Sequence, residues 1–82
     1  NPEGLDARTR FLVTIAALTV LGPVGEPQLR VTIKNALAAG ATKREIAEVI
    51  WQMSMFGGMS AMQKALEVAQ AVFAETPEEK DA

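Results

Sequence analysis

The stretch from Gly40 to Ala61, GATKREIAEVIWQMSMFGGMSA, constrains the fold more than any other part of the chain. Thr42 and Glu45 form the T-x-x-E pattern, in which each side chain accepts a hydrogen bond from the other residue's backbone N–H. The sequence therefore predicts a helix that begins near Lys43. Two adjacent glycines after Phe56 are poor helix formers, so the helix should end there and the chain should change direction.

This predicted helix has two different apolar sides. One side forms a stripe at spacings i, i+3, i+4 and i+7, typical of a helix packed on its own core, and consists of Ile46, Val49, Ile50 and Met53. The opposite side combines two bulky apolar groups with an acid and an amide, and consists of Glu48, Trp51, Gln52 and Met55. The second side predicts a further contact, with a ligand or another subunit.

The run FLVTIAALTVL, residues 11–21, predicts a first helix that neighbours enclose on most sides, because it is apolar nearly all round. Asp6 suits its N-cap, and Gly22-Pro23 should end it. Eleven residues are about half the ~20 needed to cross a bilayer. Glu3 and Asp6 before the run, and no small-x-small site after it, also disfavour a secretory signal. We expect a cytoplasmic protein without a membrane partner.

Two further helices complete the predicted fold. Pro27 suits the first position of the second helix, and Gly40 suits the residue in the left-handed conformation that ends it. The apolar stripe of this helix consists of Leu29, Ile33, Ala36 and Leu37. Ser60 and Gln63 form a second possible capping box, which would begin the last helix. The apolar stripe of this helix consists of Met62, Leu66, Ala69 and Phe73. The sequence thus predicts one all-α domain over 1–82, a four-helix subunit with a lead-in at 1–5 and a charged tail at 76–82.

Composition narrows the possible chemistry. Apolar residues make up 49% of only 82 residues, and this surplus predicts a symmetric homo-oligomer, because one small core leaves apolar area to bury. The chain has no cysteine and no histidine, which excludes a thiolate nucleophile and the commonest metal ligands, so we expect no metal and no cofactor. A net charge of -2 without a basic cluster predicts no nucleic-acid binding.

Several residues have both a structural and a functional interpretation. The four methionines, Met53, Met55, Met59 and Met62, could suggest a Cu(I) site, but packing at a glycine-rich helix junction explains them better. Glu48 could pair with Arg44 one turn earlier, or act as an acid whose pKa is raised by its apolar neighbours. Arg30 and Lys34 could form a solvated basic strip or an anion clamp.

The segments LDARTRFLVTIAAL (5–18) and IKNALAAGATKREIAEVIWQMSMFGGMSAMQKALEVAQAVF (33–73) resemble the carboxymuconolactone decarboxylase family, which includes alkylhydroperoxidase-like proteins. The most specific parts are AL-x-AGAT at Ala36–Thr42, E-V-I-x-Q at Glu48–Gln52, and Phe56-Gly57-Gly58, where members commonly have Tyr-Ala-Gly. The resemblance implies an all-helical bundle that assembles as trimers or hexamers.

The resemblance also bears on activity. The hydroperoxidase branch uses C-x-x-C followed by a histidine, and in this sequence Gly25, Gln28 and Thr32 take those places, which implies no thiol peroxidase activity. Thr32 also stands where the decarboxylase branch often keeps the histidine. Phe11 replaces a glutamate often found after the T-R pair.

The resemblance implies a lyase that acts on a small carboxylated lactone or related acid, in aromatic compound catabolism. Its predicted catalytic residues are Glu48 as proton donor, Gln52 on a carbonyl oxygen, and Thr32 on a water or substrate oxygen. The predicted substrate-binding residues are Arg30 or Lys34 for the carboxylate, and Trp51, Met55 and Phe56 to exclude water. The alternative is a catalytically silent family member that serves as an oligomeric small-molecule-binding scaffold.

Overall fold

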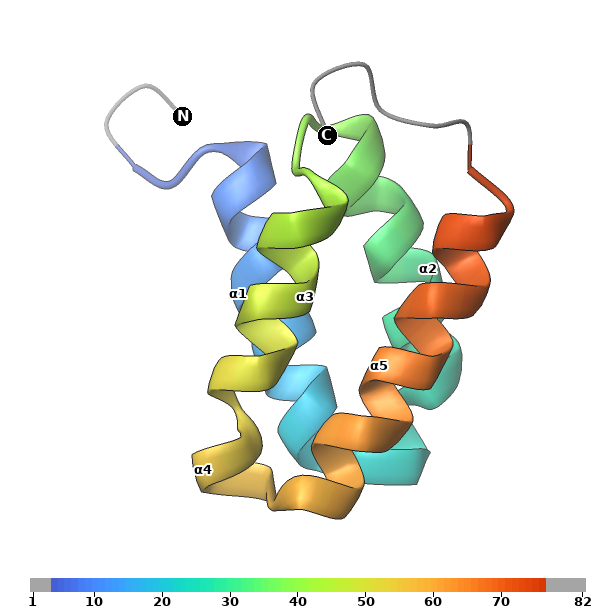
Figure 1. Cartoon of the computed structure of the whole chain (residues 1–82). Helices are drawn as coiled ribbons and strands as arrows, with labels where there is room; N and C mark the ends of the chain where they lie inside the picture. Colours follow the sequence, from blue (N-terminus) through green and yellow to red (C-terminus); the bar gives the residue numbers. More distant parts are fainter. Residues whose placement is uncertain (1–3, 77–82) are drawn as a thin grey trace.

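The first half of the chain folds as a helical hairpin in the computed structural model, which describes residues 4–76. Helix α1 (Ala7–Leu21) begins after Asp6, whose carboxylate accepts a 2.8 Å hydrogen bond from the Thr9 N–H, as the N-cap prediction requires. Gly22, at φ 84°, ends α1, and the 3₁₀ turn η1 (Gly22–Gly25) leads into α2 (Glu26–Ala38). The two helices lie side by side (Figure 1).

The second half adds α3 (Lys43–Gln52), the single turn α4 (Ser54–Gly57) and α5 (Met59–Ala74). Helix α3 packs on α1 and α5, and α5 packs in turn on α2, so the long helices enclose one core (Figure 1). Over the described residues 4–76 the regular elements are all helices, with no strand. The all-α class predicted from the sequence is confirmed.

The predicted helix start at Thr42 is confirmed in detail. The Thr42 hydroxyl accepts from the Glu45 N–H, and the Glu45 carboxylate accepts from the Thr42 N–H, both at 3.0 Å. Gly40 has φ 103°, the left-handed conformation expected after α2. Both features depend on residues within a few positions of each other, which is why the sequence alone identifies them.

The second predicted capping box, Ser60 with Gln63, is wrong. Gly58 at φ 89° is the residue before α5, and it turns the chain so that Met59 is already helical. Ser60 therefore lies inside the first turn, where its hydroxyl cannot serve as an N-cap. The helix predicted to run from Lys43 to Phe56 is also interrupted, because α3 ends at Gln52 and α4 is a separate turn.

The core is a single cluster to which each long helix contributes. Its fully buried apolar side chains include Ile15, Leu29, Ile33, Ala36, Ile46, Ile50, Met62, Ala65, Ala69 and Val72. The buried stripe of α5 thus differs from the prediction, since Ala65 and Val72 are buried while Leu66 and Phe73 are only partly covered. In both cases the buried residue comes one position before the predicted one in the sequence.

Helix α1 is only partly enclosed by the other helices of the single chain, and its predicted enclosure on most sides, with neighbouring subunits contributing, stays a prediction. Its fully buried side chains are Ile15 and Thr19, whereas Val13 and Leu21 are each 56% exposed. By length and apolar composition the continuous stretch Ala7–Ala38 is long enough to cross a membrane. In the fold it is bent back at Gly22, and the 15 residues of α1 reach only about 22 Å, less than the ~30 Å of a bilayer core.

Two predicted terminal segments fall mainly outside the described part of the chain. Gly4 and Leu5 of the lead-in are described and precede α1 without regular structure, whereas residues 1–3 lie outside the description. Of the predicted charged tail, Thr76 follows α5 and donates its hydroxyl proton to the Val72 carbonyl at 2.8 Å. Residues 77–82 lie outside the description.

Candidate functional site

A row of polar side chains runs along one side of α3. Arg44, Glu48 and Gln52 are spaced at i, i+4 and i+8, which places them above one another on the helix surface. The Arg44 Nε lies 3.9 Å from the Glu48 Oε2, so the ion pair considered from the sequence is present. Both side chains remain largely in solvent, at 86% and 68% exposure. We call these three residues the α3 row.

An apolar groove between α1 and α3 borders the α3 row. It has a volume of about 430 Å³, and its apolar walls are Leu12, Val13, Ala16, Val49 and Met53. Glu48 and Gln52 line the same groove, with Thr9 and Glu45. The structure therefore brings two of the predicted catalytic residues to the edge of an apolar hollow that a small ligand could occupy.

Trp51 lies on the other side of the α3 row. Its indole is 63% exposed, and together with Ala47 and the three residues of the row it lines a second, shallow depression. The row thus has apolar surface on both sides. The sequence predicted this neighbourhood correctly, because residues 48, 51 and 52 are neighbours on any α-helix.

Thr32, the third predicted catalytic residue, lies elsewhere. It is on α2, in a shallow hollow that also includes Val24, Pro27, Gln28 and Val31. None of these residues lines the groove with Glu48. A single chain therefore does not bring Thr32 and Glu48 into one pocket.

The predicted carboxylate-binding residues are also apart from Glu48. Arg30 pairs with the Glu75 carboxylate just beyond α5, and the Lys34 Nζ lies 3.7 Å from the same carboxylate. Both cations lie on α2 and are used to hold the end of α5. Within the described residues they are neither a purely solvated strip nor a vacant anion clamp.

The residues expected to shield Glu48 from water are themselves exposed. Met55 and Phe56 lie on α4, with exposed fractions of 84% and 72%, and neither lines the groove. Met59 is 60% exposed, so the packing explanation of the methionines holds for the buried Met62 but not for Met55 and Met59. Shielding of Glu48 would need a surface from outside the single chain.

Arg44 is a functional candidate that the sequence predicts only as an ion-pair partner of Glu48. Its spacing to Glu48 and Gln52 also indicates one continuous polar row. In the structure its guanidinium pairs with the Glu48 carboxylate. Arginine also binds a carboxylate through two parallel N–H bonds, which suits the role first given to Arg30 or Lys34.

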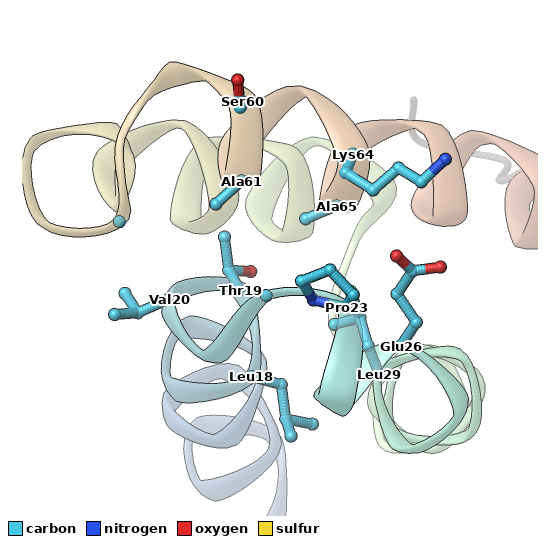
Figure 2. A pocket seen from close by; sticks show the side chains of 12 residues that line it. Leu18, Thr19, Val20, Pro23, Glu26, Leu29, Ser60, Ala61, Lys64 and Ala65 are labelled. Carbon is cyan, nitrogen blue, oxygen red and sulfur yellow. The ribbon is translucent and has the colours of Figure 1, made fainter.

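A fourth hollow lies away from all of these residues. It is formed by the end of α1, the η1 turn, the start of α2 and the first turns of α5, as Figure 2 shows. None of the site residues predicted from the sequence lines it. Its walls come from two stretches that are far apart in the chain, residues 18–29 and 57–65, so no local sequence motif marks it.

Comparison with known proteins gives consistent results. The profile of the Carboxymuconolactone decarboxylase family matches residues 1–71. An uncharacterized 15.0 kDa protein from the nqo9-nqo10 intergenic region of Paracoccus denitrificans is 71% identical over 79 residues, which cover 96% of this chain and 59% of that protein. A 4-carboxymuconolactone decarboxylase of Acinetobacter baylyi is 40% identical over 70 residues, covering 85% of this chain and 51% of the enzyme. The chain thus spans little more than half of either relative.

Proposed function

Since the chain belongs to the carboxymuconolactone decarboxylase family, we propose that it is a carboxy-lyase acting on a small carboxylated lactone or related acid. One observation carries the proposal: a cation, an acid and an amide lie in one row beside an apolar groove. The relative of known activity, a 4-carboxymuconolactone decarboxylase, suggests 4-carboxymuconolactone as the first substrate to test. The setting would then be aromatic compound catabolism in the cytoplasm.

Each member of the α3 row has a role in the proposed reaction. Arg44 would bind the substrate carboxylate, and the apolar groove beside it would favour release of neutral CO₂. The electron pair left on carbon delocalises toward the lactone carbonyl, whose oxygen Gln52 would bind. Glu48 would then deliver a proton to the carbon. This division of roles needs no metal and no cofactor.

Substrate binding would also prepare Glu48 for this role. In the free chain Arg44 pairs with Glu48. A substrate carboxylate on Arg44 would take the place of the Glu48 carboxylate and would leave the Glu48 side chain free to contact the reacting carbon. The same ion pair that suggests a purely structural role in the free chain is thus compatible with catalysis.

We further propose a symmetric homo-oligomer, a trimer or hexamer, in which a second chain covers the α3 row. The exposed Trp51, Met55 and Phe56 supply apolar surface for such a contact. Thr32 and the pair Arg30 and Lys34 would then act on a neighbouring subunit's site, or have no catalytic role. Gly25 and Gln28, in place of a redox cysteine pair, argue against thiol peroxidase activity.

Turnover of 4-carboxymuconolactone, measured by CO₂ release, tests the proposal. Glu48→Gln should reduce kcat by about 100-fold or more, the usual contribution of a general acid. Arg44→Gln should chiefly raise KM. Glu67→Gln makes the same chemical change at an exposed position of α5, and should leave turnover unchanged. Light scattering would confirm that each variant keeps the assembly of the parent.

The outcomes separate the two candidate functions. Unchanged turnover in Glu48→Gln would exclude Glu48 as the acid. The scaffold alternative is favoured by one observation, that Thr32, Arg30 and Lys34 do not join Glu48 within a chain. Saturable lactone binding without turnover by the parent would support the scaffold and reject the enzyme.

A further inference from the structure

The hollow at the start of α5 is a concave feature that the proposed reaction does not use. Its volume is about 510 Å³, within the range of roughly 300 to 1,000 Å³ typical of small-molecule sites. Figure 2 shows Ala61 and Ala65 of α5 facing Thr19 and Pro23 across it, with Leu18 and Leu29 deeper between α1 and α2. The lining is mainly apolar, as in most ligand pockets.

Backbone geometry, and not a mobile side chain, keeps this hollow open. A Cβ on Gly57 would lie 3.1 Å from the Val20 Cα, so the turn before α5 rests directly on the end of α1. On the opposite wall, Pro23 has a fixed φ. Helix α5 lines the hollow with Ser60, Ala61, Lys64 and Ala65, and the small side chains of the two alanines leave space between the helices.

The polar groups at this hollow are mostly hydrogen-bond acceptors. Thr19 is only 2% exposed, and its hydroxyl donates its proton to the Ile15 carbonyl at 2.8 Å, which leaves oxygen lone pairs to accept. The Glu26 carboxylate forms no ion pair with another described residue. Lys64 is the cation of the rim, and its Nζ lies 3.6 Å from the Glu67 Oε1.

We propose that this hollow is a second ligand site, and that it binds a neutral hydroxylated ring compound of the phenol class. The hydroxyl would donate to Thr19 or Glu26 and accept from Lys64, while the ring would fill the space next to Ala61 and Ala65. A rigid ring loses less conformational freedom on binding than a flexible chain of the same apolar area.

Charged ligands of similar size are disfavoured by the same residues. A carboxylate has no proton to donate to Thr19 and is repelled by Glu26. An ammonium group would be attracted by Glu26 but repelled by Lys64, and would lose its hydration in an apolar hollow. The opposite charges of Glu26 and Lys64 therefore favour a neutral group that can both donate and accept.

Titration of the ¹⁵N-labelled chain with 4-propylphenol, followed by NMR, tests this site. We expect saturable shifts of the Leu29, Ala61 and Ala65 amides, and weaker binding of 4-propylbenzoate. Thr19→Val should weaken 4-propylphenol binding about fivefold, the effect of one hydrogen bond, without changing propylbenzene binding. Thr19→Ser keeps the hydroxyl and should bind like the parent.

Two further variants make the test decisive. Ala61→Leu fills the hollow, and should abolish binding while circular dichroism shows a folded chain. Glu48→Gln should bind 4-propylphenol normally, because this site does not depend on the proposed lyase site. No saturable shifts, equal affinity for 4-propylbenzoate, or unchanged binding by folded Ala61→Leu would each overturn the proposal.

Discussion

The two ends of the helical bundle are built in opposite ways (Figure 1). At the end where α1 and α3 begin, which we call the capped end, Asp6 and the Thr42–Glu45 box cap the helices, and the Arg8 Nη1 binds the Glu45 Oε2 at 2.9 Å. At the end where α2 and α5 begin, which we call the apolar end, neither helix has a side-chain cap. Its exposed side chains include Val20, Leu21, Val24, Met55, Phe56 and Met59.

The two ends differ in whether one chain satisfies their polar groups and covers their apolar side chains. The capped end satisfies its backbone groups with its own side chains, and the Lys43 Nζ also donates to the Phe73 carbonyl at the end of α5, at 3.3 Å. The apolar end leaves Val24 78%, Met55 84% and Phe56 72% exposed. Exposed apolar residues gathered at one end of a small protein are typical of an interaction surface. The capped end satisfies its polar groups within one chain, whereas the apolar end leaves apolar surface exposed, which is compatible with the proposed homo-oligomer.

The largest expected effect comes from placing a charge beside the apolar end. Trp51→Glu should dissociate the proposed homo-oligomer, because an unpaired carboxylate would be buried in the contact. Light scattering would report the fall in mass. Gln70→Glu introduces the same charge on an exposed face of α5, and should leave the mass unchanged. A parent chain that is a monodisperse monomer at micromolar concentration would contradict the prediction.

The next largest effect concerns the close contact inside the apolar end. Gly57→Ala should lower the free energy of unfolding by about 1 to 3 kcal/mol, because the new Cβ would lie 3.1 Å from the Val20 Cα. Urea denaturation would measure the loss. Val20→Ala should not rescue it, since the closest atom belongs to the backbone. A Gly57→Ala chain as stable as the parent would show that α4 can shift away from α1.

The sequence predicts the capped end better than the apolar end for a physical reason. The caps at Asp6 and Thr42 depend on side chains within three residues of the groups they bind. At the apolar end, the position of α4 against α1 involves the close approach of Gly57 to Val20, residues far apart in sequence. Local hydrogen bonds can be inferred from residue types, but such long-range contacts cannot.

The same distinction applies to the candidate site. Glu48, Gln52 and Trp51 were correctly placed together, because helical periodicity alone determines that they are neighbours. The groove beside them was not predicted, since it depends on how α1 packs against α3. The ion pairs of Arg30 and Lys34 with Glu75 were not predicted either, because Glu75 is more than 40 residues away from both in sequence.

A smaller effect is expected from removing one cap. Thr42→Ala should lower the free energy of unfolding by about 1 kcal/mol, the usual contribution of an N-cap side chain. Thr42→Ser retains the hydroxyl and should restore most of the loss. The same urea experiment measures both variants. Equal stability of the alanine and serine variants would show that the hydroxyl contributes nothing at this helix start.

The smallest effect should come from the charge of Glu45. The hydrogen bond from the Thr42 backbone N–H lowers the pKa of Glu45 below its ordinary value, and the Arg8 guanidinium adds a smaller lowering. A carboxyl whose pKa is lower in the folded state stabilises the fold above its unfolded pKa, about 4.3, and this stabilisation is lost as pH falls through the folded pKa. Glu45→Gln can still cap Thr42, and removes only the charge.

Urea midpoints of the parent and Glu45→Gln at several pH values test this last expectation. The parent should be modestly more stable at pH 7, and the difference should shrink below about pH 4, as Glu45 takes up a proton in both states. Glu67→Gln, at an exposed position of α5 that caps no helix, controls for loss of a surface charge. A difference that persists at pH 2 would show that the carboxylate charge is not its cause. The stability of the capped end would then come from the neutral hydrogen bonds of the Thr42–Glu45 box alone.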